Sequence, residues 1–213
     1  LAALNYDGYA YNTAVGYQAG KLVTTGVQNI LIGALAGDAL TTGSNNIAIG
    51  VDALSAELTG GRNVAIGRYA LQDLNTDSNA YNVAIGHAAG ADITTGLYNT
   101  LIGGLAGDAL TTGSENVAVG YFALSSDDAG GRSVAVGQGA LKLQNGGSLH
   151  VYNTAVGFES GKNMSSGVEN TLIGGLAGDA LTTGVGNVAV GYLALSTEDT
   201  YGTNTAIGRG AFQ

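Results

Sequence analysis

The sequence predicts an all-β protein, a parallel β-solenoid (β-roll) of about twelve coils of 17 residues each. Three observations predict this fold: a short motif recurs at a nearly constant spacing, its residues alternate with period two, and the spacing is too short for a strand plus a helix. The composition agrees, because 37 of the 213 residues are Gly, none is Pro or Cys, and 45% are apolar, which is enough to form a core.

The motif consists of Asn, then Thr, Ile or Val, then Ala or Leu, then Val or Ile, then Gly. It occurs twelve times, and its spacing of 17 residues lengthens to 19 and 20 before the fifth and ninth copies. We number the places of each unit from the first motif residue. The first place is Ser133 in one unit and Asn in the others, and the fifth place is always Gly. These Asn are Asn12, Asn29, Asn46, Asn63, Asn82, Asn99, Asn116, Asn153, Asn170, Asn187 and Asn204, and the Gly are Gly16, Gly33, Gly50, Gly67, Gly86, Gly103, Gly120, Gly137, Gly157, Gly174, Gly191 and Gly208.

Four units form a superrepeat. The ninth place is Gly in two units and then Leu in two, as in Gly20, Gly37, Leu54 and Leu71, with Phe212 in the last unit, and the fourth unit carries the extra residues. We therefore predict one solenoid segment over 1–213, an excerpt of a longer repeat array. Its parts are the end of a coil at 1–11 and superrepeats at 12–81, 82–152 and 153–213.

Each unit is expected to hold two short strands and two turns. Alternation such as Ile47, Ala48 and Ile49 predicts a strand, while the recurring TTG and the fifth-place Gly supply turns. We expect the second- and fourth-place side chains to fill a thin interior and the third-place Ala or Leu to form an outer stripe. At about 4.8 Å per coil, the rod would be roughly 55 Å long.

Two kinds of residue are predicted to hold the rod together. The first-place Asn residues should form a column of stacked amides, so we interpret them as structural. The outer Ala/Leu stripe, which includes Ala14 and Leu31, needs a cover. We expect a homotrimer in which this stripe packs near its own symmetry mates.

Charge and residue types exclude several classes of function. The chain has 7 basic and 16 acidic residues, so a nucleic acid or an anionic membrane surface is not an expected partner. No apolar run reaches the roughly 20 residues of a membrane span, so membrane insertion by this segment is not expected. His87 and His150 are its only His, and no nucleophile, base and acid can be assembled, so we expect no enzyme, cofactor or metal site. His87 is interpreted as a surface ring.

Several strings carry a resemblance to known families. SVAVG at 133, NTAVGYQAG at 12 and TTGSNNIAIG at 41 resemble the head repeats of YadA-like trimeric autotransporter adhesins, and the 17-residue form with TTG resembles repeats of bacteriophage tail-fibre proteins. The resemblance covers the whole chain. It implies a homotrimeric parallel β-roll, left-handed in the adhesin heads, used as an elongated stalk or receptor-binding head. The units are longer than those of the adhesin heads, and these residues contain no neck, coiled-coil stalk, anchor or chaperone domain.

The expected function is that of a non-enzymatic structural and adhesive fibre segment outside the cell. The first hypothesis is a phage tail fibre or other virion appendage, serving as a rigid spacer or receptor-binding shaft. The alternative is the head of a bacterial trimeric autotransporter adhesin that binds host surfaces. A polysaccharide-processing solenoid is a remote alternative, because it needs a carboxylate pair across a groove, and the acids at 127–128 and 198–199, near Asp52 and Glu57, are expected to be solvated.

The lengthened units predict where a ligand could bind. Extra residues cannot enter stacked strands, so 5–11, 75–81 and 144–152 should bulge outward as loops. Aromatic rings there suit a host glycan or protein surface. The candidate contacts are Tyr6, Tyr9, Tyr81, His150 and Tyr152. The alternative is that the Tyr that directly precedes each repeat Asn packs against the next coil.

Two further patterns recur in the sequence. Asp38, Asp108 and Asp179 recur in the nearly constant second unit and could hold a cation around a threefold axis, but a turn-capping role is favoured because their neighbours are Gly, Ala and Leu. The Thr pairs suggest ice binding only remotely, since the third and fourth units of a superrepeat lack the pair.

Overall fold

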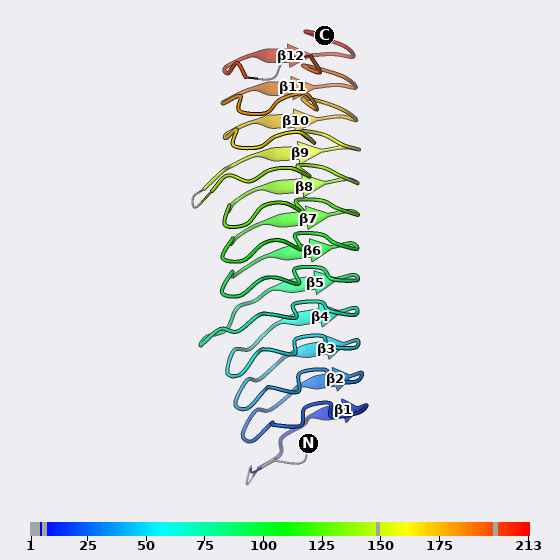
Figure 1. Cartoon of the computed structure of the whole chain (residues 1–213), viewed down its shortest axis with the longest axis vertical. Coiled ribbons are helices and arrows are strands. Elements are labelled where there is room, and N and C mark those ends of the chain that lie inside the picture. Colours follow the sequence, from blue (N-terminus) through cyan, green and yellow to red (C-terminus); the bar gives the residue numbers. More distant parts are fainter. Residues whose placement is uncertain (1–4, 6–7, 148–149, 198–199) are drawn as a thin grey trace.

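The computed structural model describes residues 5, 8–147, 150–197 and 200–213, and the prediction of a parallel β-solenoid is confirmed: its coils stack into a rod (Figure 1). Twelve strands of three residues form one parallel sheet, in which consecutive strands are neighbours. The strands are β1 (Thr13–Val15), β2 (Ile30–Ile32), β3 (Ile47–Ile49), β4 (Val64–Ile66), β5 (Val83–Ile85), β6 (Thr100–Ile102), β7 (Val117–Val119), β8 (Val134–Val136), β9 (Thr154–Val156), β10 (Thr171–Ile173), β11 (Val188–Val190) and β12 (Thr205–Ile207).

The strands pair place for place along the whole sheet. Ile30 lies opposite Ile47, and the same register holds across the lengthened units, where Val64 pairs with Val83 and Val134 with Thr154. The extra residues therefore lie outside the sheet, as predicted, because a one-residue slip would turn each side chain to the other face.

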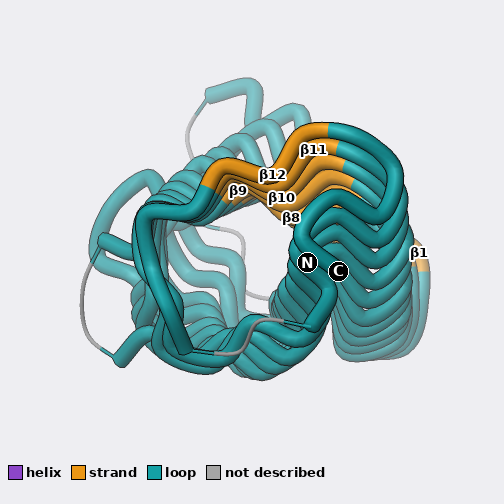
Figure 2. Tube along the Cα trace, turned by 90° about the horizontal axis from the view of Figure 1, so that it is seen from above, coloured by secondary structure: helices purple, strands orange, loops and turns teal. Residues whose placement is uncertain are grey.

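The prediction of two strands per coil is wrong. Each described coil has one strand on one side of its closed cross-section and loops elsewhere (Figure 2), apart from isolated bridges between Gly61 and Asn79 and between Gly131 and His150. We call the part of each coil that leads from one strand to the next the return side. It is bent by left-handed residues at the seventh, ninth and seventeenth places, such as Leu35 (φ 59°) and Asn45 (φ 62°). Repeated left-handed residues interrupt the extended backbone that a second strand requires.

The predicted assignment of the inner and outer faces is also wrong. Third-place residues such as Leu31 and Ala48 are fully buried inside the coil, whereas fourth-place residues such as Ile32 and Ile102 are 37% and 38% exposed. The interior has room for one row of strand side chains because the return side supplies the rest of the core, for example Leu40. The Ala/Leu stripe is therefore core, and the β-branched residues form the outer face.

Core packing explains why the second and third units of a superrepeat differ. Leu31 at the third place of its unit is paired with Gly37 at the ninth, where an added Cβ would lie 2.8 Å from Leu31 Cδ2. The next unit reverses the sizes, with Ala48 at the third place and the buried Leu54 at the ninth. Because a core needs complementary volumes at near-crystalline density, a large residue on one side requires a small one on the other.

The fifth-place Gly forms the corner after each strand, as predicted. Its φ lies between 121° and 144° in all twelve units, a region that favours Gly. An added Cβ on Gly33 would lie 2.4 Å from the carbonyl oxygen of Gly50 in the next coil. The corner therefore needs Gly both for its conformation and for the close approach of the coils.

The first-place Asn side chains form the expected column of hydrogen-bonded amides. Asn29 donates from Nδ2 to the Gly43 carbonyl (2.9 Å), and its Oδ1 accepts a hydrogen bond from the backbone amide of Asn46 (2.9 Å). Both side chains are fully buried. The Asn29 amide thus joins a turn of its own unit to the next coil, which satisfies buried polar groups that would otherwise destabilise the rod.

Candidate functional site

The lengthened units form two loops that protrude from the same side of the rod in Figure 1. We call residues 75–81 the first loop and the described residues 144–147 and 150–152 the second loop. Tyr81 and Tyr152 are 42% and 47% exposed, and His150 is exposed. Near the amino-terminal end, Tyr9 is 83% exposed and its ring lies 5.8 Å from that of Tyr11. The predicted contact residue Tyr6 lies outside the described residues.

A buried carboxylate anchors the first loop. Glu57 occupies the twelfth place, a core place filled by Leu40 and Leu74 in neighbouring units, and is itself fully buried. Its Oε1 accepts hydrogen bonds from the backbone amides of Leu58 (3.0 Å) and Gly60 (2.8 Å). Its Oε2 accepts from the Thr76 backbone amide (3.2 Å) and hydroxyl (3.1 Å). The start of the first loop is therefore fixed to the core.

A second buried carboxylate, Asp127, anchors the second loop from the equivalent place. Its Oδ2 accepts a hydrogen bond from Nε2 of Gln144 (2.6 Å). Gln144 also donates to the Ser133 hydroxyl (3.0 Å), and its Oε1 accepts from Nδ2 of Asn153 (2.8 Å). Gln144 thus replaces the amide that the Asn column lacks at Ser133. The same side chain also hydrogen bonds to Asp127, the anchor of the second loop.

These anchors correct the expectation that the acids at these turns are solvated. Burial raises the pKa of Glu57 and of Asp127, although the hydrogen bonds that each accepts oppose the shift. Asp128 is exposed and Asp52 is half-buried, while residues 198–199 lie outside the described residues. Glu57 and Asp127 are enclosed in the core, so neither can serve the solvent-facing carboxylate pair that polysaccharide hydrolysis requires.

A row of side chains at the seventeenth place runs beside the loops. Arg62 donates from Nη1 to the Tyr81 hydroxyl, and its guanidinium carbon lies 5.3 Å from the Tyr81 ring centroid. The Tyr81 ring stacks on Tyr98 of the next coil, with centroids 5.8 Å apart and planes 20° apart. We call these three residues the first cluster. The expectation that Tyr81 packs against the next coil is therefore confirmed.

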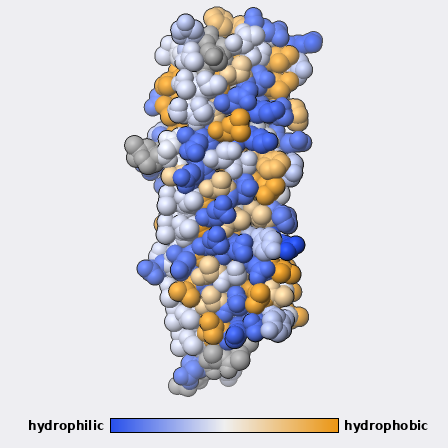
Figure 3. All heavy atoms as spheres, in the orientation of Figure 1, coloured by the Kyte–Doolittle hydropathy of each residue, from blue (hydrophilic) through white to orange (hydrophobic). Residues whose placement is uncertain are grey.

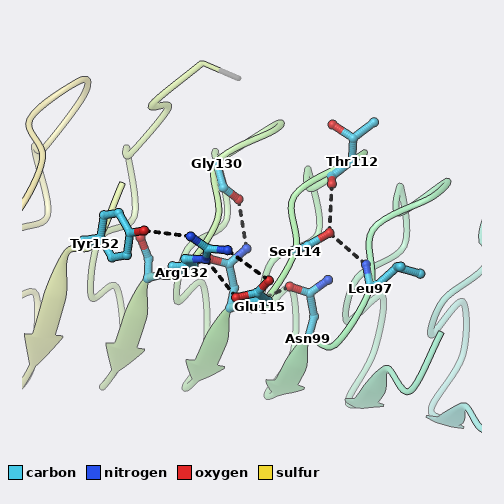
Figure 4. A network of polar contacts seen from close by, with 10 residues as sticks. Leu97, Asn99, Thr112, Ser114, Glu115, Gly130, Arg132 and Tyr152 are labelled. Atoms are coloured by element: carbon cyan, nitrogen blue, oxygen red, sulfur yellow. Dashed lines mark hydrogen bonds and ion pairs between the residues drawn. The ribbon is translucent and has the colours of Figure 1, made fainter. Parts of the chain in front are cut away.

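Around the second loop, Arg132 and Tyr152 are equivalent to Arg62 and Tyr81, and Glu169 stands where the first cluster has Tyr98. Together with Glu115 and His150, these residues form the second cluster. Arg132 lies between Glu115 and Tyr152 (Figure 4), donating from Nε to Glu115 Oε2 (2.8 Å) and from Nη1 to the Tyr152 hydroxyl (2.7 Å). The hydrogen bond from Arg132 lowers the pKa of Glu115. The His150 ring lies edge-on to Tyr152 at 5.9 Å.

The sequence interpretation identified Tyr81, His150 and Tyr152 but missed their partners Arg62, Tyr98, Arg132 and Glu115. The signal was present, because Arg62 and Tyr98 each occupy the seventeenth place, and neighbouring coils bring residues of one place together. The structure joins the aromatic candidates to these charged and aromatic partners in two separate clusters, not in one site.

The remaining candidates show no binding geometry among the described residues. Burial raises the pKa of Asp108 to about 6, and Asp92 contributes in the same direction. The Oδ1 atoms of Asp108 and Asp179 are buried without a hydrogen-bond partner, yet the described part of the chain has no group of three or more His, Cys, Asp or Glu placed to hold a metal ion. His87 is an exposed ring beside Tyr69, in agreement with its interpretation.

Comparisons with protein-family models, with curated proteins and with solved structures gave no match. Within the described residues, no helix is long and apolar enough to cross a membrane.

Proposed function

We propose that this chain is a rigid, non-enzymatic segment of a homotrimeric fibre outside the cell, a phage tail fibre or other virion appendage. In this proposal the rod acts as a spacer, and its loops contact a surface glycan or protein of the host. The observation that carries the proposal is the outer face of the twelve-stranded sheet.

The outer face of the sheet is apolar along the full rod. Its fourth places are all Val or Ile, its second places are Val, Ile or Thr, and none is charged, although the chain has a net charge of −9. Ile32, Ile102 and Ile173 are 37%, 38% and 40% exposed. By contrast, the face seen in Figure 3 mixes hydrophilic and hydrophobic residues with no continuous apolar band. Long exposed apolar patches favour association.

A second and third copy of the same chain are the proposed cover. Twelve strands about 4.8 Å apart and about 10 Å long give a face of roughly 530 Å², and flanking side chains raise it toward the ~800 Å² per partner of a stable interface. An identical copy has the same coil spacing, so its Val and Ile rows can match this face at every coil. Cyclic symmetry then buries the same face of each subunit.

The placement of the loops supports the attachment role. Both loops leave the rod beside the seventeenth-place row and carry exposed Tyr81 and Tyr152. In a trimer they would recur every four coils and three times around the axis. Weak contacts repeated in this way gain strength from avidity.

The assembly is tested with matched lysine substitutions. Ile102→Lys places a charge on the outer sheet face, whereas Leu58→Lys places one at a site of similar exposure, 41%, away from the strands. We expect Ile102→Lys to shift the protein toward monomer in light scattering and Leu58→Lys to leave the trimer intact. Equal masses for the two variants would reject the sheet face as the interface.

A further inference from the structure

The two clusters occupy equivalent places but differ in charge. Arg62 and Arg132 lie 70 residues apart, as do the residues one coil before them, Asn45 and Glu115. One coil beyond the loop Tyr, the first cluster has Tyr98, and the second has Glu169. Each cluster thus has one Arg and one loop Tyr, but the flanking places are neutral around Arg62 and acidic around Arg132.

The charge of Arg62 is not neutralised by a nearby acid. Among the described residues, the side chain of Arg62 hydrogen bonds only to Tyr81, and its guanidinium forms no ion pair. Asp77 in the first loop is exposed and does not form one with it. In contrast, both nitrogens that Arg132 directs at Glu115 lie within 3.4 Å of its carboxylate. The first cluster therefore presents an unused positive charge on an otherwise acidic chain.

We propose that the first cluster binds a carboxylate-bearing sugar, an inference that rests on the proposed attachment function. The remaining N–H groups of Arg62 form a planar fork that fits a carboxylate. The Tyr81 hydroxyl accepts from Arg62, so its own proton is free to donate to a sugar hydroxyl. The Tyr98 ring, 54% exposed, offers an apolar surface to the sugar ring.

The first loop holds this site in place. Thr76 fixes its start to buried Glu57, and Asn79 near its end pairs with Gly61, the residue before Arg62. Tyr81 is held between Arg62 and Tyr98. A preorganised site loses little conformational entropy on binding, which suits a small ligand with few contacts.

The proposal is tested by titrating the assembled protein with sialyllactose, trigalacturonate and, as the neutral control, lactose, followed by calorimetry or NMR. We expect at least one acidic sugar to bind and lactose not to bind; the two acidic probes separate a sialic acid source from a uronic acid source. Arg62→Ala should weaken binding at least tenfold, and Asn45→Glu should do so by recreating the ion pair of the second cluster. Arg132→Ala should leave binding unchanged.

A second test gives the second cluster the neutral flanking residues of the first cluster. Glu115→Asn combined with Glu169→Tyr should raise the stoichiometry from one acidic sugar per chain to two. Binding of lactose as strong as that of the acidic sugars, no acidic binding at all, or full binding by Arg62→Ala would overturn the proposal. Light scattering on the same samples distinguishes failure of the sugar-site proposal from failure of the fibre proposal. A trimer that binds no acidic sugar rejects the sugar site alone, whereas a monomer rejects the trimeric fibre.

Discussion

The first and second loops leave the rod at equivalent points of successive superrepeats but are fastened by different residues. In the first, Glu57 accepts hydrogen bonds from Thr76, and the Asn column passes unbroken through Asn63. In the second, Asp127 accepts from Gln144, which also repairs the column at Ser133. The comparison shows that a buried carboxylate next to each loop can be paired with different hydrogen-bond donors.

On the surface, by contrast, the residues around the two loops differ in charge. The two clusters keep their Arg and loop Tyr in both superrepeats, yet the flanking residues change from neutral Asn45 and Tyr98 to acidic Glu115 and Glu169. Solvent screens exposed charges, so packing does not fix their sign. Surface charge is therefore the feature in which the two loops can differ in function.

The largest expected effect tests the Gly corner after each strand, which the two superrepeats share. Gly33→Val and Gly103→Val should each destabilise the protein by at least about 3 kcal/mol, because both residues have φ near 135° and an added Cβ would lie 2.4 and 2.5 Å from a carbonyl oxygen of the next coil. Chemical denaturation measures both. The control is Gly104→Ala, which should be nearly neutral because Ala34 stands at the same place. A clear difference between the two Val variants would show that the corners are not equivalent.

The next largest effect tests the anchor that differs between the two loops. Gln144→Leu should cost about 2 kcal/mol, because it leaves Asp127, Ser133 and Asn153 each without one hydrogen-bond partner. Leu is the residue at this place beside the first loop. Adding Ser133→Asn should recover part of the loss by restoring the column. If Gln144→Leu melts at the parent temperature, the second anchor contributes nothing.

A smaller effect concerns pH. The pKa of Asp108 is raised from 3.8 to about 6, so the folded state holds this proton more tightly than the unfolded state, and the resulting stability is complete below pH 3.8 and is lost as the pH rises through 6. After solvent screening we expect on the order of 1 kcal/mol. Asp108→Asn should flatten this dependence more than Asp38→Asn, since Lys21 opposes the shift at Asp38. Denaturation at pH 4 to 7.5 measures it, and equal flattening by both variants would contradict this explanation.

The smallest effect concerns the exposed ion pair. Glu115→Gln removes the partner of Arg132 but should leave the melting temperature unchanged within error, because an exposed ion pair contributes little to stability. Asn45 shows that the equivalent place tolerates a neutral residue. A large loss of stability in this variant would mean that the second cluster is structural.

The sequence was sufficient to predict the solenoid because a 17-residue repeat with one alternating segment leaves few other folds. It did not reveal which face of the strand points inward, since alternation is the same for either choice. Leu40 and Leu54 on the return side decide this, and their direction depends on left-handed backbone that sequence alone does not show.

The site was predicted in part for a similar reason. Extra residues had to leave the sheet, so the loops and Tyr81 could be located. Arg62 and Tyr98 were missed because their contact with Tyr81 follows from the stacking of coils, not from nearness in sequence. Asp127 was expected in solvent because it falls in a variable turn, although its place in the unit is a core place that Glu57 also fills.

The most direct test of the account is the mass and register of the assembly. Light scattering on the unaltered chain should give three times its 21.1 kDa mass. With Ile102→Cys, oxidation should link residue 102 of one subunit to residue 102 of another, because identical coils meet at the sheet face. A monodisperse monomer, or a trimer that does not form this link, would contradict the claim that the Val and Ile face of the solenoid assembles the fibre.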